Sequence, residues 1–159
     1  LSGSGKSTIA NAVEKRLYAQ GMHAYVLDGD NLRMGLNADL GFTPEDRAEN
    51  VRRVSEVAKV LVDAGLVVLV AIISPFEADR RRAKSLFEDE EFIEVFVDTP
   101  VEICAQRDPK GLYKKAKDGK LSNLSGVGQD YEAPIDPNLT VDGSKDIAKV
   151  VKEIMEKII

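Results

Sequence analysis

The chain has 159 residues, 43% of them hydrophobic and 31% charged, which describes one globular domain large enough to bury a core. Its formal net charge of −5 argues against nucleic acid as the main partner, because nucleic-acid-binding proteins present a surplus of cations. A single cysteine excludes an internal disulfide, and with no signal peptide or long apolar run we expect no membrane segment and a cytoplasmic protein.

The first eight residues (LSGSGKST) contain the end of a phosphate-binding loop, G-x-x-x-x-G-K-[ST]. The first glycine of that pattern would precede Leu1, so we expect the chain to begin inside the motif, after the strand that normally leads into it. Backbone N–H groups of such a loop bind phosphate oxygens, Lys6 reaches the β- and γ-phosphates, and the Ser7 hydroxyl ligates Mg²⁺. The residues expected to bind ATP here are Gly3, Ser4, Gly5, Lys6, Ser7 and Thr8.

The alternative for this segment is a glycine- and serine-rich linker that ends by chance in Gly-Lys-Ser. Apolar residues follow it at helical spacing, so the loop opens a helix as phosphate binding requires, and this favours the functional interpretation.

Strands and helices alternate along the rest of the chain. We expect strands over residues 23–27, 66–73, 92–97 and 138–141, the second of them buried on both faces. We expect helices over residues 6–20, 43–64, 76–90 and 112–117, one or two helical turns within 31–40, a helix that reaches residue 107, and a last helix after the final strand. The expected N-caps are Thr43 for the helix over 43–64, Thr99 for the helix that reaches residue 107, and Ser144 for the last helix.

This alternation predicts an α/β fold with a parallel sheet, of five strands when the strand expected before Leu1 is counted. We expect one domain over residues 1–159. Residues 108–134 are rich in Gly, Lys and Asp and poor in apolar residues, which predicts a mobile lid. Ligands of parallel sheets bind beyond the carboxyl ends of the strands, so the phosphate loop, Asp28, Asp30, Ser74 and Asp98 should share one rim.

Asp28 and Asp30 flank a glycine where the first strand ends. Phosphoryl transfer needs a metal-linked acid and a group that orients or deprotonates the attacking hydroxyl, and two carboxylates can supply both. The alternative is an ordinary acidic turn. The sequence does not say which of the two would be the base.

Arginines and one aromatic residue follow these acids. Arg47 and Asn50 share a helical face, and arginine suits bidentate binding of phosphate or sulfate. Phe42 lies in a loop where it would stack on a base, or serve as a hydrophobic staple of the next helix. For at least one of Arg52 and Arg53 we favour a solvated position.

Together these segments resemble the adenylylsulfate (APS) kinase family, whose members have a P-loop kinase fold. The resemblance covers nearly the whole chain and is carried by the phosphate loop and by residues 28–42 (DGDNLRMGLNADLGF), 46–65 (DRAENVRRVSEVAKVLVDAG), 73–76 (ISPF), 94–116 (EVFVDTPVEICAQRDPKGLYKKA) and 131–134 (YEAP). It implies transfer of the γ-phosphoryl of ATP, with Mg²⁺, to the 3′-hydroxyl of adenosine 5′-phosphosulfate (APS), as in sulfate assimilation.

The resemblance also implies roles for single residues. Ser74 matches a serine that the family's description treats as a phosphorylated intermediate, although a strand-end serine also fits ligand binding or capping. Leu124 stands where the family has a phenylalanine and would form the second wall of the APS adenine site. Arg107 would pack on the ATP adenine, and Lys110 belongs to the segment that covers APS. The residues expected to bind APS are Arg33, Phe42, Arg47, Asn50, Ser74, Lys110 and Leu124, and those expected in catalysis are Lys6, Asp28, Asp30 and Ser74.

Two other functions stay open from the sequence: another P-loop kinase for a small metabolite, or a non-catalytic nucleotide-sensing domain of a sulfate-activating protein. The expected partners are ATP and APS. A homodimer, and fusion to or association with ATP sulfurylase, are also expected from the resemblance.

Overall fold

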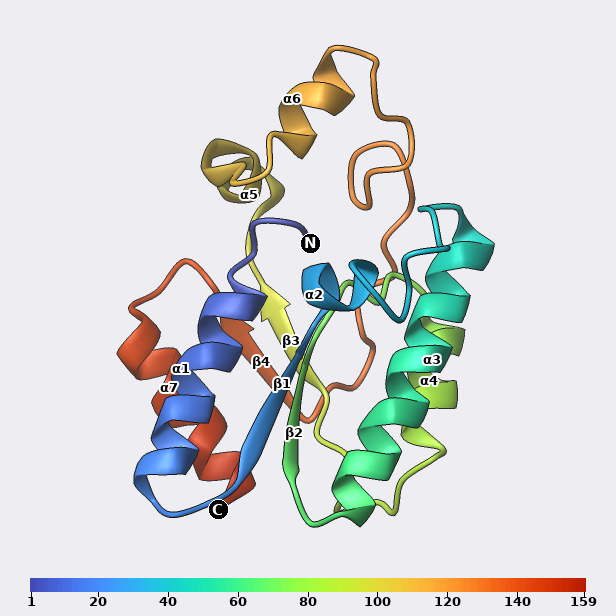
Figure 1. Cartoon of the computed structure of the whole chain (residues 1–159). Helices are drawn as coiled ribbons and strands as arrows, with labels where there is room; N and C mark the ends of the chain where they lie inside the picture. The colour runs from blue at the N-terminus through green and yellow to red at the C-terminus, as the bar shows by residue number, and fades with distance from the viewer.

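The computed structural model describes all 159 residues, and parallel strands form the middle of the molecule. The strands are β1 (Ala24–Asp28), β2 (Val67–Ala71), β3 (Val95–Asp98) and β4 (Leu139–Asp142). Two parallel pairs form, β1 with β2 and β3 with β4, in registers that set Asp28 beside Ala71 and Asp98 beside Asp142. The carboxyl ends of all four strands lie at the same upper rim (Figure 1), which confirms the α/β fold with parallel strands.

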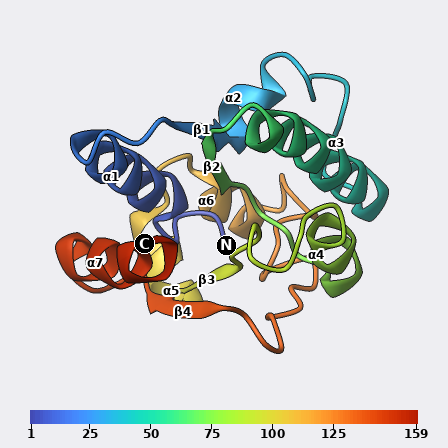
Figure 2. The same cartoon turned by 90° about the horizontal axis from the view of Figure 1, so that it is seen from below.

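Helices cover both sides of these strands. They are α1 (Lys6–Ala19), α2 (Gly29–Arg33), α3 (Pro44–Asp63), α4 (Glu77–Lys84), α5 (Val101–Arg107), α6 (Leu112–Lys117) and α7 (Ile147–Ile158). In two perpendicular views, α1 and α7 lie on one side of the strands and α3 and α4 on the other (Figures 1 and 2). Helices α5 and α6 and the loop after them lie above the rim. None of the helices has both the length and the apolar composition needed to cross a bilayer.

The four strands match the number expected within the chain, but β2 is less buried than expected. No hydrogen-bonded ladder joins β2 to β3, so β2 is paired along one edge only. The prediction that this strand is buried on both faces was wrong, since Val70 is 45% exposed. The fifth strand was expected before Leu1 and stays a prediction.

Of the three helix caps expected from the sequence, only one is confirmed. Thr43 Oγ1 accepts a hydrogen bond from the Asp46 backbone N–H at 3.2 Å, as an N-cap does. Thr99 caps nothing, because α5 starts one residue later, after Pro100, without a side-chain cap. Ser144 was also wrong as a cap: Asp146 caps α7, while the Ser144 hydroxyl donates to Asp142.

Two apolar clusters hold the helices to the strands. The larger joins α1, β4 and α7 through seven buried residues, among them Val13, Leu17, Val141 and Val150. A second cluster packs Val54 and Ala58 of α3 against β1. Because α1 begins at Lys6, its packing against α7 and β4 fixes the phosphate loop at the rim.

Leu17→Ala should test this anchoring. Leu17 has no exposed surface, and truncation leaves a cavity that costs about 2–5 kcal/mol of unfolding free energy. Chemical denaturation should show this loss, whereas Tyr18→Ala, at a neighbour that is 79% exposed, should change stability little. Equal losses in the two variants would contradict the assigned packing.

Candidate active site

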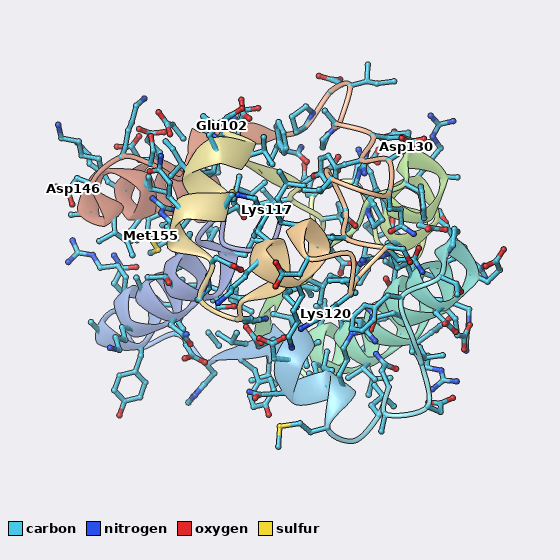
Figure 3. All side chains as sticks on the ribbon, turned by 90° about the horizontal axis from the view of Figure 1, so that it is seen from above. Glu102, Lys117, Lys120, Asp130, Asp146 and Met155 are labelled. Carbon is cyan, nitrogen blue, oxygen red and sulfur yellow. The ribbon has the colours of Figure 1, made fainter.

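A cavity of about 710 Å³ opens at the rim, where sequence reasoning expected the ligands to bind. The expected site residues that line it are Gly3, Gly5, Lys6, Ser7, Thr8, Asp28, Asp30, Arg33, Phe42, Arg47, Asn50, Arg107 and Lys110. Segments far apart in the chain therefore meet in one space. Viewed from above (Figure 3), α6 crosses the middle of the molecule over this rim, with Lys117 at its end and Lys120 just beyond it.

The phosphate loop has the backbone that its glycines allow. Gly3 and Gly5 have φ values of 74° and 104°, a region that L-residues with a side chain rarely adopt. A Cβ on Gly3 would also lie 2.8 Å from the Cys104 carbonyl oxygen. Helix α1 follows directly, with no side chain capping its N-terminus, so its first N–H groups remain available for an anion.

Lys6 lies inside this loop, and its ammonium donates to the Leu1 carbonyl and, at 3.3 Å, to Ser4 Oγ. Burial, and then repulsion from Lys110, lower the pKa of Lys6 to about 8. A phosphate at this position would relieve both effects, because it would replace lost hydration and offset the second cation.

The two acids lie in different surroundings. One carboxylate oxygen of Asp28 accepts a hydrogen bond from the Ser7 hydroxyl. The other oxygen of Asp28 accepts from the Asp30 backbone N–H at 2.9 Å, so Asp28 is the N-cap of α2. Asp30 instead forms an ion pair with Lys110, from the segment expected to be the lid. Asp28 is thus bonded to the phosphate loop, whereas Asp30 is paired with the segment expected to be the lid.

An aromatic ring and two guanidinium groups form another part of the cavity lining. The Arg33 guanidinium carbon lies 4.4 Å and that of Arg47 5.5 Å from the Phe42 ring centroid. Arg33 donates to the carbonyls of Leu40 and Gly41, both at 3.0 Å, so it also fixes the loop that carries Phe42. Burial, and then repulsion from Arg33, lower the pKa of Arg47 to about 10.

Asn50 is oriented by a residue that the sequence analysis did not single out. The amide of buried Asn37 donates to Asn50 Oδ1 at 3.0 Å, which leaves the Asn50 amide nitrogen for the cavity. Arg53 holds the same loop by donating to the Leu36 carbonyl and by pairing with Asp39. The expectation of a solvated position therefore fits Arg52, which pairs with Glu49 alone.

Three expected site residues do not line the cavity. Ser4 is fully buried behind the phosphate loop. Ser74 follows the lining residue Ile73, and its carbonyl accepts from Arg80 at 2.7 Å. Leu124, 3% exposed, packs with Cys104 and Tyr113, because an apolar side chain gains more from this cluster than from the wet cavity. The structure therefore does not bring Leu124 to the expected second wall of an adenine site.

The cavity also has lining residues that were not expected. Gly143 and Lys145 reach it from the turn between β4 and α7. Arg107 donates to the Gly143 carbonyl at 3.0 Å and to the Gly3 carbonyl at 3.2 Å. The signal that would have found this turn is its position after a parallel strand, where ligands collect.

Comparisons with known proteins agree on one family. The family model described as adenylylsulphate kinase matches residues 1–142. The adenylyl-sulfate kinase of Lactiplantibacillus plantarum is 61% identical over 145 residues, 91% of this chain and 70% of that protein. The bifunctional enzyme NodQ of Rhizobium meliloti is 58% identical over 161 residues; the match covers 99% of this chain but only 25% of that enzyme's length.

A solved structure agrees closely as well. The Mycobacterium tuberculosis APS kinase CysC, in complex with AMPPNP and APS, superposes with a TM-score of 0.95 at 48% sequence identity, covering 99% of this chain and 92% of that one.

The pKa of Lys6 makes nucleotide binding a proton-linked event. An anionic phosphate beside the ammonium favours its charged form, so at pH 8 and above, where free Lys6 is partly neutral, ADP binding should take up a proton. Calorimetry in buffers of different ionisation enthalpy measures that uptake, which should shrink at lower pH. The arginine in Lys6→Arg stays charged at these pH values, so this variant should show no proton uptake. Uptake of the same size in Lys6→Arg would mean that Lys6 is not the group that takes up the proton.

Proposed function

This chain belongs to the adenylylsulfate kinase family, and we propose that it is itself an ATP-dependent adenylylsulfate kinase. It transfers the γ-phosphoryl of ATP to the 3′-hydroxyl of APS and releases 3′-phosphoadenosine 5′-phosphosulfate and ADP, a step of sulfate activation. The observation that carries the proposal is that the phosphate loop and the group formed by Arg33, Phe42 and Arg47 line one cavity. A donor and an acceptor bound in the same cavity can react without leaving it.

We assign the donor half of the cavity to ATP. Gly3, Gly5 and Thr8 supply backbone N–H groups for the phosphates, and Lys6 supplies a charge for the transferred group. The Ser4 N–H is already bonded to the Leu1 carbonyl at 3.3 Å, so Ser4 shapes the loop without contacting phosphate. Arg107, held by two carbonyls, has its guanidinium fixed beside the loop and offers a flat face to the ATP adenine.

The oxygen ligands present suit Mg²⁺ bound together with ATP. The Ser7 hydroxyl and the Asp28 carboxylate are hydrogen-bonded to each other at the loop, and no group of three or more acidic, His or Cys side chains forms a fuller cage. Mg²⁺ commonly takes one or two protein oxygens and completes its shell with phosphate and water. When bound, the ion would neutralise charge that develops on the transferred phosphoryl.

The acceptor half fits the anionic and aromatic parts of APS. Arg33 and Arg47 suit the phosphosulfate, the Asn50 amide nitrogen donates a hydrogen bond, and the Phe42 ring stacks on the adenine. Lys110 adds a cation from the lid. We leave Leu124 out of this set, since it is buried away from the cavity.

Asp30 is our candidate for the general base. It pairs with the lid residue Lys110, whereas Asp28 is bonded to the Ser7 hydroxyl. Asp30 takes the proton of the 3′-hydroxyl while that oxygen forms a bond to the γ-phosphorus, and the bond from phosphorus to the β-bridging oxygen breaks to release ADP. This direct transfer needs no phosphorylated intermediate on Ser74. We therefore give Ser74 no covalent role and propose only that it belongs to the loop bordering the acceptor.

Residues 108–134 act in this proposal as a lid within a single domain of residues 1–159. Three contacts tie the lid to acceptor residues. They are the Lys110–Asp30 ion pair, a hydrogen bond at 2.9 Å from Arg47 to the Asn123 carbonyl, and one at 3.3 Å from the Gln129 amide to the Phe42 carbonyl. APS binding has to break or replace the first, because the base must be free to take a proton.

The wider setting of the activity is also a proposal. Reaction with ATP fits the cytoplasm, which supplies that nucleotide. NodQ is named a bifunctional enzyme, which agrees with fusion to or association with a second activity such as ATP sulfurylase. Homodimer formation is proposed from the family resemblance alone.

A coupled assay tests the activity. With ATP and Mg²⁺, ADP release should depend on APS and yield the 3′-phosphorylated product in equal amount. Gluconate, shikimate and AMP are the control acceptors. Turnover of one of them without turnover of APS would mean a different small-metabolite kinase, and nucleotide binding without any transfer would mean a sensor domain.

Two isosteric variants separate the acids. Asp30→Asn should lower kcat by about 10²- to 10⁴-fold, as expected on loss of a general base, while APS still binds. Asp28→Asn should chiefly raise the Mg²⁺ concentration needed for half-maximal rate. Steady-state kinetics with titrated Mg²⁺ measures both; near-normal kcat for Asp30→Asn would remove Asp30 from the base role.

A further inference from the structure

Three consecutive carbonyl groups of the phosphate loop are each bound by a side chain from outside the loop. Tyr113 Oη donates to the Ser2 carbonyl at 2.8 Å, and Thr99 Oγ1 donates to the Ser4 carbonyl at 2.9 Å. Between them, the Gly3 carbonyl accepts from Arg107 at 3.2 Å. The donors come from the end of β3, from α5 and from the lid helix α6, so no single element produces this arrangement.

We propose that Thr99 and Tyr113 are positioning residues for ATP: they hold the Ser4 and Ser2 carbonyls away from the cavity, so that the loop presents N–H groups to the phosphates. Each peptide plane carries a donor at one end and an acceptor at the other. A carbonyl turned toward the cavity would repel a phosphate oxygen and remove a donor. The loop's glycines make such rotation easy, because they restrict φ least.

The surroundings of Thr99 show that its hydroxyl is committed to this bond. Thr99 and Ser4 are both buried, so the Ser4 carbonyl has no solvent to bind in place of the hydroxyl. Gly143, in the β4–α7 turn, packs directly against this hydrogen bond. A Cβ on Gly143 would lie 2.2 Å from Thr99 Oγ1 and 2.3 Å from the Ser4 carbonyl oxygen. This bond, and not a helix cap, is the role of Thr99.

Tyr113 is likewise buried, and it packs in the cluster that contains Cys104 and Leu124. Burial raises the pKa of Tyr113, so its phenol keeps the proton that it donates to the Ser2 carbonyl. Because Tyr113 lies on α6, the lid helix carries one of the groups that shape the ATP site. The proposal rests on the proposed use of this loop to bind ATP.

The test compares variants that differ in one donor. Thr99→Val keeps the shape and removes the hydroxyl, whereas Thr99→Ser keeps the hydroxyl and serves as the matched control. We expect Thr99→Val to weaken ADP binding about tenfold in calorimetry, as loss of a buried hydrogen bond implies, and Thr99→Ser to bind close to the parent. The KM for ATP should rise in the same order while the KM for APS stays unchanged.

Tyr113→Phe provides a second variant, with the ring retained, and should weaken ADP binding in the same direction. A thermal unfolding transition measured before titration shows that each variant is folded. The proposal is overturned if Thr99→Val and Tyr113→Phe bind ADP like the parent, or if Thr99→Ser is as weak as Thr99→Val. A parent that binds ADP but never phosphorylates APS would refute the proposed function, and the ADP titrations would still decide the role of Thr99.

Discussion

Burial of cations at the rim is the constraint on which the site depends. A protein of net charge −5 binds two polyanionic nucleotides only if its positive groups gather where the ligands bind. Here burial disfavours the charges of Lys6 and Arg47, and repulsion from Lys110 and Arg33 adds to that cost. In the proposed function, the phosphate and sulfate groups of the ligands would offset these charges on binding.

The fold supplies the rigidity that this repulsion requires. Parallel pairing brings the ends of β1 and β2 together, and the packing of α1 against α7 holds the phosphate loop at the same rim. Arg33 and Arg47 are held in place by backbone carbonyls: Arg33 donates to those of Leu40 and Gly41, and Arg47 to that of Asn123. Cations bound in this way cannot move apart, so relief has to come from an incoming anion or from a carboxylate such as Asp30.

Local signals predicted the fold and most of the cavity, and they failed where the contact partner is distant in sequence. The Thr43 cap was predictable because its partner lies three residues away, and the Arg47–Asn50 pair because one helix sets its geometry. Thr99 shows the same cap pattern, yet its partner, the Ser4 carbonyl, lies 95 positions away. The expectation for Leu124 came from the family resemblance and not from a local signal; in the structure this side chain packs with Cys104 and Tyr113.

The arrangement around Phe42 sets a geometric limit on how a nucleobase can stack there. Arg33 lies over the ring with its guanidinium carbon 4.4 Å from the centroid, and two hydrogen bonds to the Leu40 and Gly41 carbonyls hold it there. Displacing it would cost those bonds and the cation–π contact together. The Arg47 guanidinium carbon lies further away, 5.5 Å from the centroid, and Phe42 as a residue is 47% exposed, so a base can contact the ring without removing Arg33. In the function proposed above, an adenine on the exposed part of the Phe42 ring would stack there, while Arg33 stays close enough to meet the anionic part of the same ligand.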